Sequence, residues 1–466
     1  MEWAPPIGSA IEHVSWPAIP SAPAAGALAL LYRLERSQWW PAEALPASQL
    51  RQLGAVVDHA LRTCPFYRRT YRKAKIRIDG PLTDELWQRL PVLSRQDLLT
   101  HYKDICSRTP PVGHDVTDEA LTSGSTGRPV RVRKTVATGA IFQALVLREH
   151  GWYRRDLGKT MAVIAPPLGT PAPYPDGVQT LHWDRETASV FQTGPGARLD
   201  LETPVEEQIE WLLRVQPAYL ATFSTNLRAL AEHALRHGIK LPGLVQVIGY
   251  AEALREDTRE LCRQAWNVDV IERYSTDEFG QLGIQCPEHG NLHACAESVL
   301  LEVVDEDNRP CAPGQMGRVL VSSLWNFATP LLRYELGDLA ELGPPCGCGR
   351  GLPVIASIRG RTRDMVRLPD GRTHLPYFSG LSVGIDAVRQ FQVRHVAGDR
   401  LEVHLVAGRP LDGAEAAELT RRLQDRLRYP FEVTLIYVDG IARTPGGKYM
   451  DFVSDIGPSE RMRGDA

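Results

Sequence analysis

Between residues 117 and 322 the sequence alternates short apolar runs with longer amphipathic stretches, and no other feature constrains the fold as strongly. The apolar runs have the length of strands, and the stretches between them have the length and periodicity of helices. The predicted strands are Met161–Ala165, Ala218–Phe223, Val245–Gly249, Val268–Ile271, Val299–Val304 and Arg318–Ser322. The predicted helices are Thr138–His150, Val205–Val215, Thr225–Gly238 and Glu252–Trp266. This order favours an α/β core with a mostly parallel sheet.

The two ends of the chain differ from this core. Residues 1–35 are rich in proline, alanine and serine and predict a draped segment with a helix over Ala24–Glu35, before a second helix over Gln49–Thr63. In the last hundred residues we expect three strands around an amphipathic helix, at Arg389–Arg394, Leu401–Leu405, Ala414–Arg428 and Phe431–Tyr437. The sequence thus predicts a large domain over residues 1–362 and a small α+β domain over residues 363–466.

Charge and composition exclude several classes of protein. The 466 residues carry 53 basic and 56 acidic side chains, so no chain-wide nucleic-acid or polybasic membrane signature is present. The apolar run Ala24–Tyr32 is too short to span a bilayer and has no signal-peptide flanks. We expect a cytoplasmic protein with neither nucleic-acid nor membrane partners. Eight cysteines in a reducing compartment predict metal ligands or reactive thiols.

The segment after residue 121 has the composition of a phosphate-binding loop. Glycines let the backbone wrap closely around an anion, and hydroxyl and amide groups supply hydrogen-bond donors. It is not a Walker loop, because no Gly-Lys-Ser/Thr ends it. A polar turn is the alternative, but basic Arg131, Arg133 and Lys134 follow and favour a phosphate site. The candidate residues are Thr122, Ser123, Gly124, Ser125, Thr126 and Gly127.

Two acidic segments follow predicted strands farther along. Tyr274, Ser275, Thr276, Asp277 and Glu278 come directly after Val268–Ile271, where ligands collect in open α/β sheets. A carboxylate there could hold Mg²⁺ against a nucleotide phosphate, although a surface acidic loop fits equally well.

The second acidic segment is Leu331–Leu339. Its Asp338 follows a glycine and could accept hydrogen bonds from both hydroxyls of a ribose, and Arg361 could pair with phosphate or ribose oxygens. A salt-bridged hinge between domains is compatible with the same residues.

Cysteines and histidines gather in two stretches that together resemble a zinc knuckle. Cys286, His289 and His293 lie in the first stretch, and Cys346 and Cys348 form a Cys-x-Cys pair sixty residues later. Three thiolates and one imidazole suit tetrahedral Zn²⁺ with no open position. Only one histidine is expected to bind, and the sequence does not decide which. Scattered buried cysteines are the alternative.

Lys448 closes an Arg443–Lys448 segment rich in glycine and proline. Such a loop can present one lysine to neutralise a carboxylate and an α-phosphate together, as a transition-state clamp. As an isolated residue, it would be read as a solvated surface lysine.

Taken together, these segments resemble the adenylate-forming superfamily, in its phenylacetate–CoA ligase-like branch. The matching stretches run from about 38 to 455, and their order along the chain is more specific than any one of them. They are Cys64–Tyr67, Thr122–Pro129, Thr329–Asp338, Cys346–Arg350 and Arg443–Lys448. The resemblance implies a large adenylation domain with mixed or parallel sheets and a small mobile α+β domain.

The resemblance also assigns expected roles. The phosphate loop would contact ATP, Ala251 and Glu252 would lie beside adenine, and Tyr274 would stack near it. Ser275, Thr276 and Asp277 would line the same nucleotide site, Glu278 would hold Mg²⁺, and Asp338 with Arg361 would bind the ribose. Lys448 would catalyse attack of a carboxylate on the α-phosphorus, releasing pyrophosphate.

The implied substrates are ATP with Mg²⁺ and a carboxylic acid, which in this branch is often aromatic. Phe142, Tyr153 and Tyr250 are candidates for its pocket. The acceptor would be CoA or a carrier thiol, and the resemblance also implies a structural Zn²⁺ and allows a homodimer.

Three departures from the branch leave other readings open. Asp277 stands where members carry a hydroxyl, and Arg363 replaces a hinge carboxylate. The turn Leu368–Thr373 is one residue longer than the ligase pattern, in the region that lines the thiol tunnel of CoA ligases. An amine or other nitrogen acceptor, giving an amide or N–N product, is therefore an alternative to CoA. A degenerate nucleotide-binding partner protein is a third reading.

Overall fold

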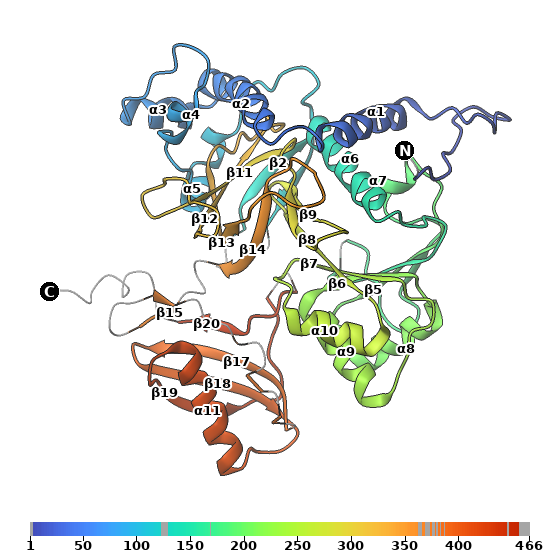
Figure 1. Cartoon of the computed structure of the whole chain (residues 1–466), viewed down its shortest axis with the longest axis vertical. Helices are drawn as coiled ribbons and strands as arrows, with labels where there is room; N and C mark the ends of the chain where they lie inside the picture. The colour runs from blue at the N-terminus through green and yellow to red at the C-terminus, as the bar shows by residue number, and fades with distance from the viewer. Residues whose placement is uncertain are drawn as a thin grey trace. The chain divides into compact units, whose positions relative to one another are not determined.

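A computed structural model describes residues 3–122, 129–167, 169–361, 366–368, 373–374, 378, 381–382, 384–385, 387–444 and 447–455, excluding the side chains of residues 361, 367, 373 and 374. The chain forms two compact units (Figure 1). Unit 1 comprises Met1–Leu254 and Thr258–Ile358, and unit 2 comprises Arg255–Asp257 and Arg359–Ala466. The domain boundary expected between residues 362 and 363 lies outside the described residues.

Unit 1 is built on one twelve-stranded mixed sheet, in the order β11-β12-β13-β14-β10-β9-β8-β7-β6-β3-β5-β4. In sheet order, β5, β3, β6, β7 and β8 pair parallel with one another. The pairs β4–β5, β8–β9, β9–β10, β10–β14, β11–β12 and β12–β13 are antiparallel. The expectation of a mostly parallel sheet therefore holds only for one half. The antiparallel strands β8 and β9 are joined by the three-residue segment 277–279, and such a link needs no crossover helix.

The strands of this sheet are β3 (Met161–Ala165), β4 (Val178–Thr180), β5 (Gly196–Asp200), β6 (Tyr219–Phe223), β7 (Gln246–Tyr250), β8 (Val270–Thr276), β9 (Gly280–Gln285), β10 (Leu292–Ala294), β11 (Val299–Val304), β12 (Met316–Ser323), β13 (Tyr334–Leu342) and β14 (Val354–Arg361). A separate antiparallel hairpin is formed by β1 (Val116–Leu121) and β2 (Arg131–Thr135).

Ten helices accompany these strands in the described part of unit 1 and its junction with unit 2. They are α1 (Ala22–Ser37), α2 (Ala44–Thr63), α3 (Pro65–Lys73), α4 (Asp84–Gln88), α5 (Arg95–Ile105), α6 (Val136–Trp152), α7 (Arg185–Ala188), α8 (Val205–Val215), α9 (Ser224–His237) and α10 (Glu256–Trp266). Within the described residues, none of the helices combines the length and apolarity needed to cross a membrane.

The helix predicted over Glu252–Trp266 begins later than expected, at Glu256. Ala251 has a left-handed φ of 67°, which no helix continues through. The Glu252 carboxylate instead accepts a hydrogen bond from the Thr225 backbone N–H at the start of α9, at 2.9 Å. Glu252 thus caps a neighbouring helix in place of starting its own.

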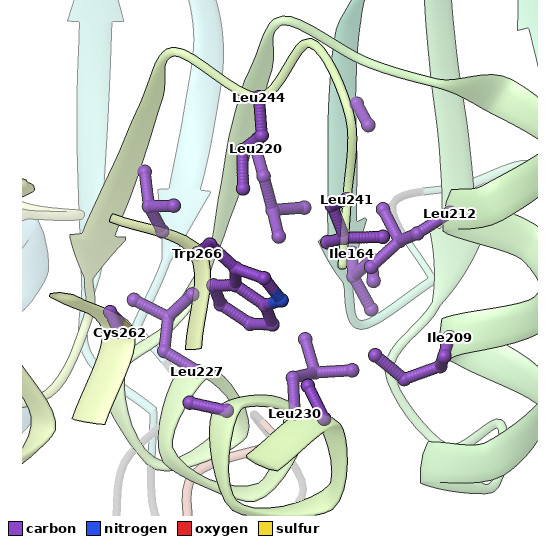
Figure 2. Close-up of a cluster of buried hydrophobic side chains, with 14 of the residues drawn as sticks. Ile164, Ile209, Leu212, Leu220, Leu227, Leu230, Leu241, Leu244, Cys262 and Trp266 are labelled. Atoms are coloured by element: carbon purple, nitrogen blue, oxygen red, sulfur yellow. The ribbon is translucent and has the colours of Figure 1, made fainter. Parts of the chain in front are cut away.

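A cluster of buried apolar side chains packs against the parallel half of the sheet. Figure 2 shows the Trp266 indole between Leu220 of β6 and Leu227 of α9, with Ile164 of β3 close by. Each such side chain contributes roughly 1.5–3 kcal/mol when fully buried. The expected strand–helix alternation creates this core, because successive parallel strands and their helices place apolar faces together.

Helix α6 carries a buried cluster of charges, which sequence reasoning did not find. Glu149 accepts hydrogen bonds from Arg155 at 2.9 Å, from Arg273 at 2.7 and 2.9 Å, and from Gln281 at 2.7 Å. Burial alone would raise the pKa of Glu149, but Arg273 and Arg155 more than offset it and hold the pKa far below its usual range. This network ties α6 to β8 and β9.

Unit 2 contains a four-stranded sheet in the order β19-β18-β17-β20, with α11 beside it. Its elements are β17 (Val388–Ala397), β18 (Arg400–Ala407), α11 (Gly413–Leu427), β19 (Glu432–Tyr437) and β20 (Phe452–Ser454), and a short hairpin pairs β15 (Val366–Arg367) with β16 (Thr373–His374). One face of α11 is fully buried and carries three leucines at a spacing of four residues, Leu419, Leu423 and Leu427. The predicted β-β-α-β order is confirmed, and β20 is an addition.

Candidate active site and metal centre

The acidic segment predicted from the sequence forms the end of β8 and the turn into β9. The Thr276 hydroxyl accepts a hydrogen bond from the Phe279 backbone N–H at 3.2 Å, and Gly280 continues the turn with a φ of 79°. Asp277 is exposed at the tip, whereas only 9% of Glu278 is exposed. The turn therefore holds one carboxylate outside and one inside.

Tyr274 and Asp338 meet inside unit 1, although they lie on different strands. The Tyr274 hydroxyl donates to Asp338 Oδ2 at 2.8 Å, and both side chains are buried. Two expected nucleotide-binding segments, β8 and β13, are thus joined by a direct hydrogen bond.

Arg333, the residue before β13, holds the start of this strand through hydrogen bonds to backbone carbonyls. Its φ is 48°, and its buried guanidinium donates to the backbone carbonyls of Gln88 at 2.5 Å and Leu90 at 2.9 Å. A positively charged group in this position satisfies several carbonyls at once. Arg333 is therefore a scaffold residue that sets where Asp338 lies.

Two basic residues approach the Asp277–Glu278 turn from other elements. Lys134 of β2 donates to the backbone carbonyls of Asp277 at 2.5 Å and Glu278 at 2.9 Å. Arg95, the first residue of α5, lies 3.9 Å from Glu278 Oε1 and donates weakly to the Thr122 hydroxyl at 3.5 Å. No local sequence signal points to Arg95, because its partners lie far along the chain.

Only the first residue of the expected phosphate loop can be described. The Thr122 backbone pairs with Val130, and its hydroxyl accepts from the Val130 N–H at 3.2 Å. Ser123, Gly124, Ser125, Thr126 and Gly127 lie outside the described residues, as does the side chain of Arg361.

The three candidate pocket residues occupy three different environments. Phe142 packs on Gly280, where an added Cβ would lie 3.0 Å from the Phe142 ring. The Tyr250 ring meets Phe223 edge-on with centroids 5.3 Å apart, and burial raises the pKa of Tyr250 to about 12. The Tyr153 hydroxyl donates to the Gln285 carbonyl at 2.8 Å. Phe142 lies beside the acidic turn, whereas Tyr153 is bonded to the far end of β9.

Lys448 belongs to unit 2, whereas Glu278 and Asp338 belong to unit 1. Its backbone is held on both sides by Thr444, through Lys448 N–H to the Thr444 hydroxyl at 3.1 Å and Thr444 N–H to the Lys448 carbonyl at 2.9 Å. Arg443 donates to the Gly447 carbonyl at 3.1 Å. The loop is thus closed on itself and presents a half-buried lysine.

A group of four metal-ligand side chains lies at the other end of β9, where Cys286 follows the strand. Cys286, His293, Cys346 and Cys348 have ligand atoms that all lie within 4.8 Å of one another. The thiols of Cys286 and Cys346 are 4.0 Å apart, and His293 Nε2 is 3.4 Å from the Cys348 sulfur. Tetrahedral zinc with Zn–S bonds of about 2.3 Å needs sulfurs about 3.8 Å apart, so the group fits that ion.

Strand pairing decides which histidine joins this group. His293 lies on β10 opposite β9 and is fully buried. Its Nδ1 donates to the Leu352 carbonyl at 3.3 Å, which leaves Nε2 as the free-lone-pair nitrogen facing Cys348. His289 lies instead against the backbone of Gly347, outside the group of four.

Arg350 connects the Cys/His group to the N-terminal helix. Its guanidinium lies 4.8 Å from the ring centre of Trp39 and 4.4 Å from that of Trp152. It also reaches the Cys286 sulfur at 4.0 Å. The adjacent Gly351 donates to the Gln38 carbonyl at 2.9 Å, so the Cys-x-Cys segment is anchored on the end of α1.

Two solved structures with the same fold are CoA ligases by name. A 2-hydroxyisobutyryl-CoA ligase in the postadenylation state superposes with a TM-score of 0.72 at 18% identity, over 90% of this chain and 92% of that one. The anthranilate CoA ligase AuaEII with anthranoyl-AMP superposes with a TM-score of 0.55 at 16% identity, over 72% and 66% of the two chains. These likenesses establish the fold.

Sequence relatives narrow the comparison. No family model matches the chain. A phenylacetate–coenzyme A ligase of Thermus thermophilus is 25% identical over 443 residues, which cover 88% of this chain and 96% of that protein. These matches support the phenylacetate–CoA ligase-like branch of the adenylate-forming ligases, which is the branch that the motifs of this chain resemble.

Further relatives agree with this assignment. A phenylacetate–coenzyme A ligase of Pseudomonas putida is 25% identical over 335 residues, and Protein CapK of Staphylococcus aureus is 24% identical over 263. The match to the Thermus ligase covers 88% of this chain, which is more than the length of unit 1, so the match extends into unit 2. The resemblance seen in the motifs of this adenylate-forming ligase is thereby confirmed.

Proposed function

We propose that this adenylate-forming ligase activates a carboxylic acid with ATP and Mg²⁺, releases pyrophosphate, and transfers the acyl group to CoA. The Tyr274–Asp338 hydrogen bond at 2.8 Å is the observation that carries the proposal, because it joins two expected nucleotide-binding segments at one point. Four of the relatives are named phenylacetate–coenzyme A ligases, and they support the two-step reaction. The cytoplasm, which supplies ATP and CoA and keeps thiols reduced, is the proposed location.

The proposed roles follow from the chemistry of each side chain. Asp338 accepts hydrogen bonds from the ribose, Tyr274 orients Asp338 and lies against adenine, and buried Glu278 holds Mg²⁺. Lys448 stabilises the charge that develops as the carboxylate attacks the α-phosphorus, and no covalent enzyme intermediate is needed. The Thr122–Gly127 loop and Arg361 are proposed to bind phosphate and ribose oxygens.

The acid is proposed to be aromatic. Phe142 packs on the glycine that follows the acidic turn, and Tyr250 ends the parallel strand β7 with its ring against Phe223. Aromatic faces at the carboxyl ends of parallel strands suit a planar apolar acid. The acid in the relatives' names, phenylacetate, supports the same class.

We also propose that Cys286, His293, Cys346 and Cys348 hold a structural Zn²⁺ ion. The donor set fills all four positions, so the ion would supply stability and no chemistry. Arg350 would offset the excess negative charge of three thiolates.

The test is a panel of aryl, amino-aryl and short aliphatic acids, measured for pyrophosphate and AMP release with ATP and Mg²⁺. Each acid is tested alone, with CoA and with a set of amines. The proposal predicts one strongly preferred aryl acid, and AMP release that CoA accelerates. Acceleration by an amine in place of CoA would establish the nitrogen-acceptor alternative, and a preferred aliphatic acid would overturn the aromatic assignment.

The matched variants are Asp338→Asn and Glu341→Gln. Both carboxylates lie on β13, but Asp338 accepts a hydrogen bond from Tyr274, whereas Glu341 accepts one from Ser357. Asp338→Asn should raise the KM for ATP, whereas Glu341→Gln should leave it unchanged. Equal effects of the two substitutions would contradict the ribose-binding role of Asp338.

A further inference from the structure

The acidic turn poses an electrostatic problem for the reaction proposed above. Asp277 and Glu278 are adjacent carboxylates, and the proposed substrate brings a polyphosphate to the same turn. A carboxylate beside a phosphate raises the cost of binding unless a cation offsets it. Glu278 has an expected Mg²⁺ partner, whereas Asp277 is exposed and carries no such role.

Lys134 is placed to supply the missing cation. Its Nζ donates to two consecutive backbone carbonyls, those of Asp277 and Glu278, and so closes the turn from the side of β2. On the hairpin, Lys134 stands directly opposite Asp118. The three carboxylates whose charges act on this ammonium group are those of Glu278, Asp277 and Asp118.

Partial burial of Lys134 changes its electrostatic surroundings. Burial is the largest influence on Lys134 and lowers its pKa to about 8, while the three carboxylates act in the opposite direction. Lys134 is half-buried, so its ammonium group is screened less by water than one on an open surface. Its two carbonyl acceptors also lose their freedom to move independently.

We propose that Lys134 is a positioning residue that fixes the Asp277–Glu278 turn and offsets the charge of Asp277, so that Mg²⁺–ATP binds beside two carboxylates. The inference rests on the proposed function, since it assumes that the turn faces a nucleotide. Lys134 touches neither the acid nor the reacting phosphorus in this account. Its effect is on the affinity for Mg²⁺–ATP and passes through Asp277.

The experiment is a double-mutant cycle of Lys134→Met and Asp277→Asn, read as the Kd for Mg²⁺–ATP by calorimetry without any acid substrate. Lys134→Met alone should weaken binding about ten-fold or more, because two charge-assisted hydrogen bonds and one cation are lost.

Asp277→Asn alone should bind Mg²⁺–ATP as tightly as the original chain or more tightly. In the double variant, Asp277→Asn should restore the part of the affinity that Lys134→Met loses through the uncompensated charge of Asp277, but not the part lost with the two hydrogen bonds to the turn.

Lys240→Met is the matched control. Lys240 also donates its ammonium group to a backbone carbonyl, that of Ala265 at 2.6 Å, but it links the end of α9 to α10. This variant should bind Mg²⁺–ATP like the original chain. If Lys134→Met fails to fold, Lys134→Gln keeps one donor and the same cycle can be measured with it.

A positioning role also predicts a split between kinetic constants. With a reactive acid, Lys134→Met should raise the KM for ATP and leave kcat at saturating ATP nearly unchanged. Additive effects of the two substitutions, or unchanged affinity in Lys134→Met, would overturn the inference. If the original chain binds Mg²⁺–ATP but no acid reacts, the proposed function fails while the cycle still tests Lys134. If it does not bind Mg²⁺–ATP, both fail together.

Discussion

Two neighbouring regions of unit 1, the candidate nucleotide site and the Cys/His group, are built in opposite ways. The Cys/His group is closed: four ligand atoms face one another, and His293 is oriented by a backbone carbonyl. The nucleotide site is open: its side chains come from α5, β2, the β8–β9 turn and β13, and Asp277 is exposed. A closed donor set leaves no position for a substrate, whereas an open one does. The first region should therefore control stability and the second chemistry.

The largest effect is expected at Lys448. Lys448→Ala should reduce acid-dependent pyrophosphate release by about 10²–10³-fold, because a cation that acts on developing charge is removed. The Kd for ATP should change by no more than about three-fold, since the lysine acts in the transition state. Stopped-time pyrophosphate assays and calorimetry measure the two quantities. A comparable loss of ATP affinity would place Lys448 in ground-state binding.

The next largest effect is expected at the Cys/His group, and on stability rather than rate. Cys346→Ser should remove bound zinc and lower the free energy of unfolding by about 2 kcal/mol or more. All ten tryptophans lie in unit 1, so their fluorescence during urea unfolding reports on this unit. Turnover per folded molecule should stay close to normal.

Cys311→Ser is the control for that substitution. Cys311 is also a buried cysteine, but it lies outside the four-residue group. It should leave the zinc content unchanged when metal is measured by mass spectrometry. A zinc-free preparation of the unaltered chain with full stability would contradict the structural role of the metal.

The buried Glu149 network gives a third test of whether stability and catalysis depend on different residues. Glu149→Gln should lower the free energy of unfolding at pH 7 by about 3–5 kcal/mol, because Arg155 and Arg273 lose a buried partner. The pKa of Glu149 is depressed in the folded chain, so its contribution is complete above the ordinary carboxyl pKa of 4.5 and is lost as pH falls below it.

The original chain should therefore lose more stability between pH 6 and pH 3.5 than Glu149→Gln does. Urea titrations at a series of pH values measure this difference. If both chains showed the same pH dependence of stability, the arginine partners would not be holding the pKa of Glu149 below its usual value.

The smallest effect is expected at Tyr274. Tyr274→Phe removes one hydrogen bond to Asp338 and keeps the ring, so the KM for ATP should rise by about 2–10-fold with kcat little changed. Steady-state kinetics with the preferred acid measures it. An unchanged KM would contradict the proposal that Asp338 binds the ribose and that the open site binds the nucleotide.

The sequence predicted the parts of the fold that have a local pattern. The strand–helix alternation predicted β3, β6, β7 and β8 of the parallel half of the sheet, and helical periodicity predicted α8, α9 and α11 within a residue or two. Strands β5, β9, β10, β13 and β14 were not predicted. For β10 and β14 the reason is that they pair with each other across a long stretch of chain, as Leu292 does with Ile355. Local periodicity carries no record of such partners.

The same limit applies to the sites. The Cys/His residues were named from their spacing, but the choice of His293 over His289 depends on β10 pairing with β9. Lys134 was seen only as a basic residue, and its contact with the acidic turn depends on the β1–β2 hairpin. Glu149 was overlooked because a charged residue in a helix is usually solvated, and its arginine partners lie on other segments.

The most direct test of the account is isotope exchange between pyrophosphate and ATP, with Mg²⁺, an aryl acid and no acceptor. This measurement isolates the first half-reaction, in which the open site is proposed to act. The account predicts exchange that requires the acid and is nearly abolished in Lys448→Ala. A chain that binds Mg²⁺–ATP yet shows no acid-dependent exchange across the whole panel would contradict the account.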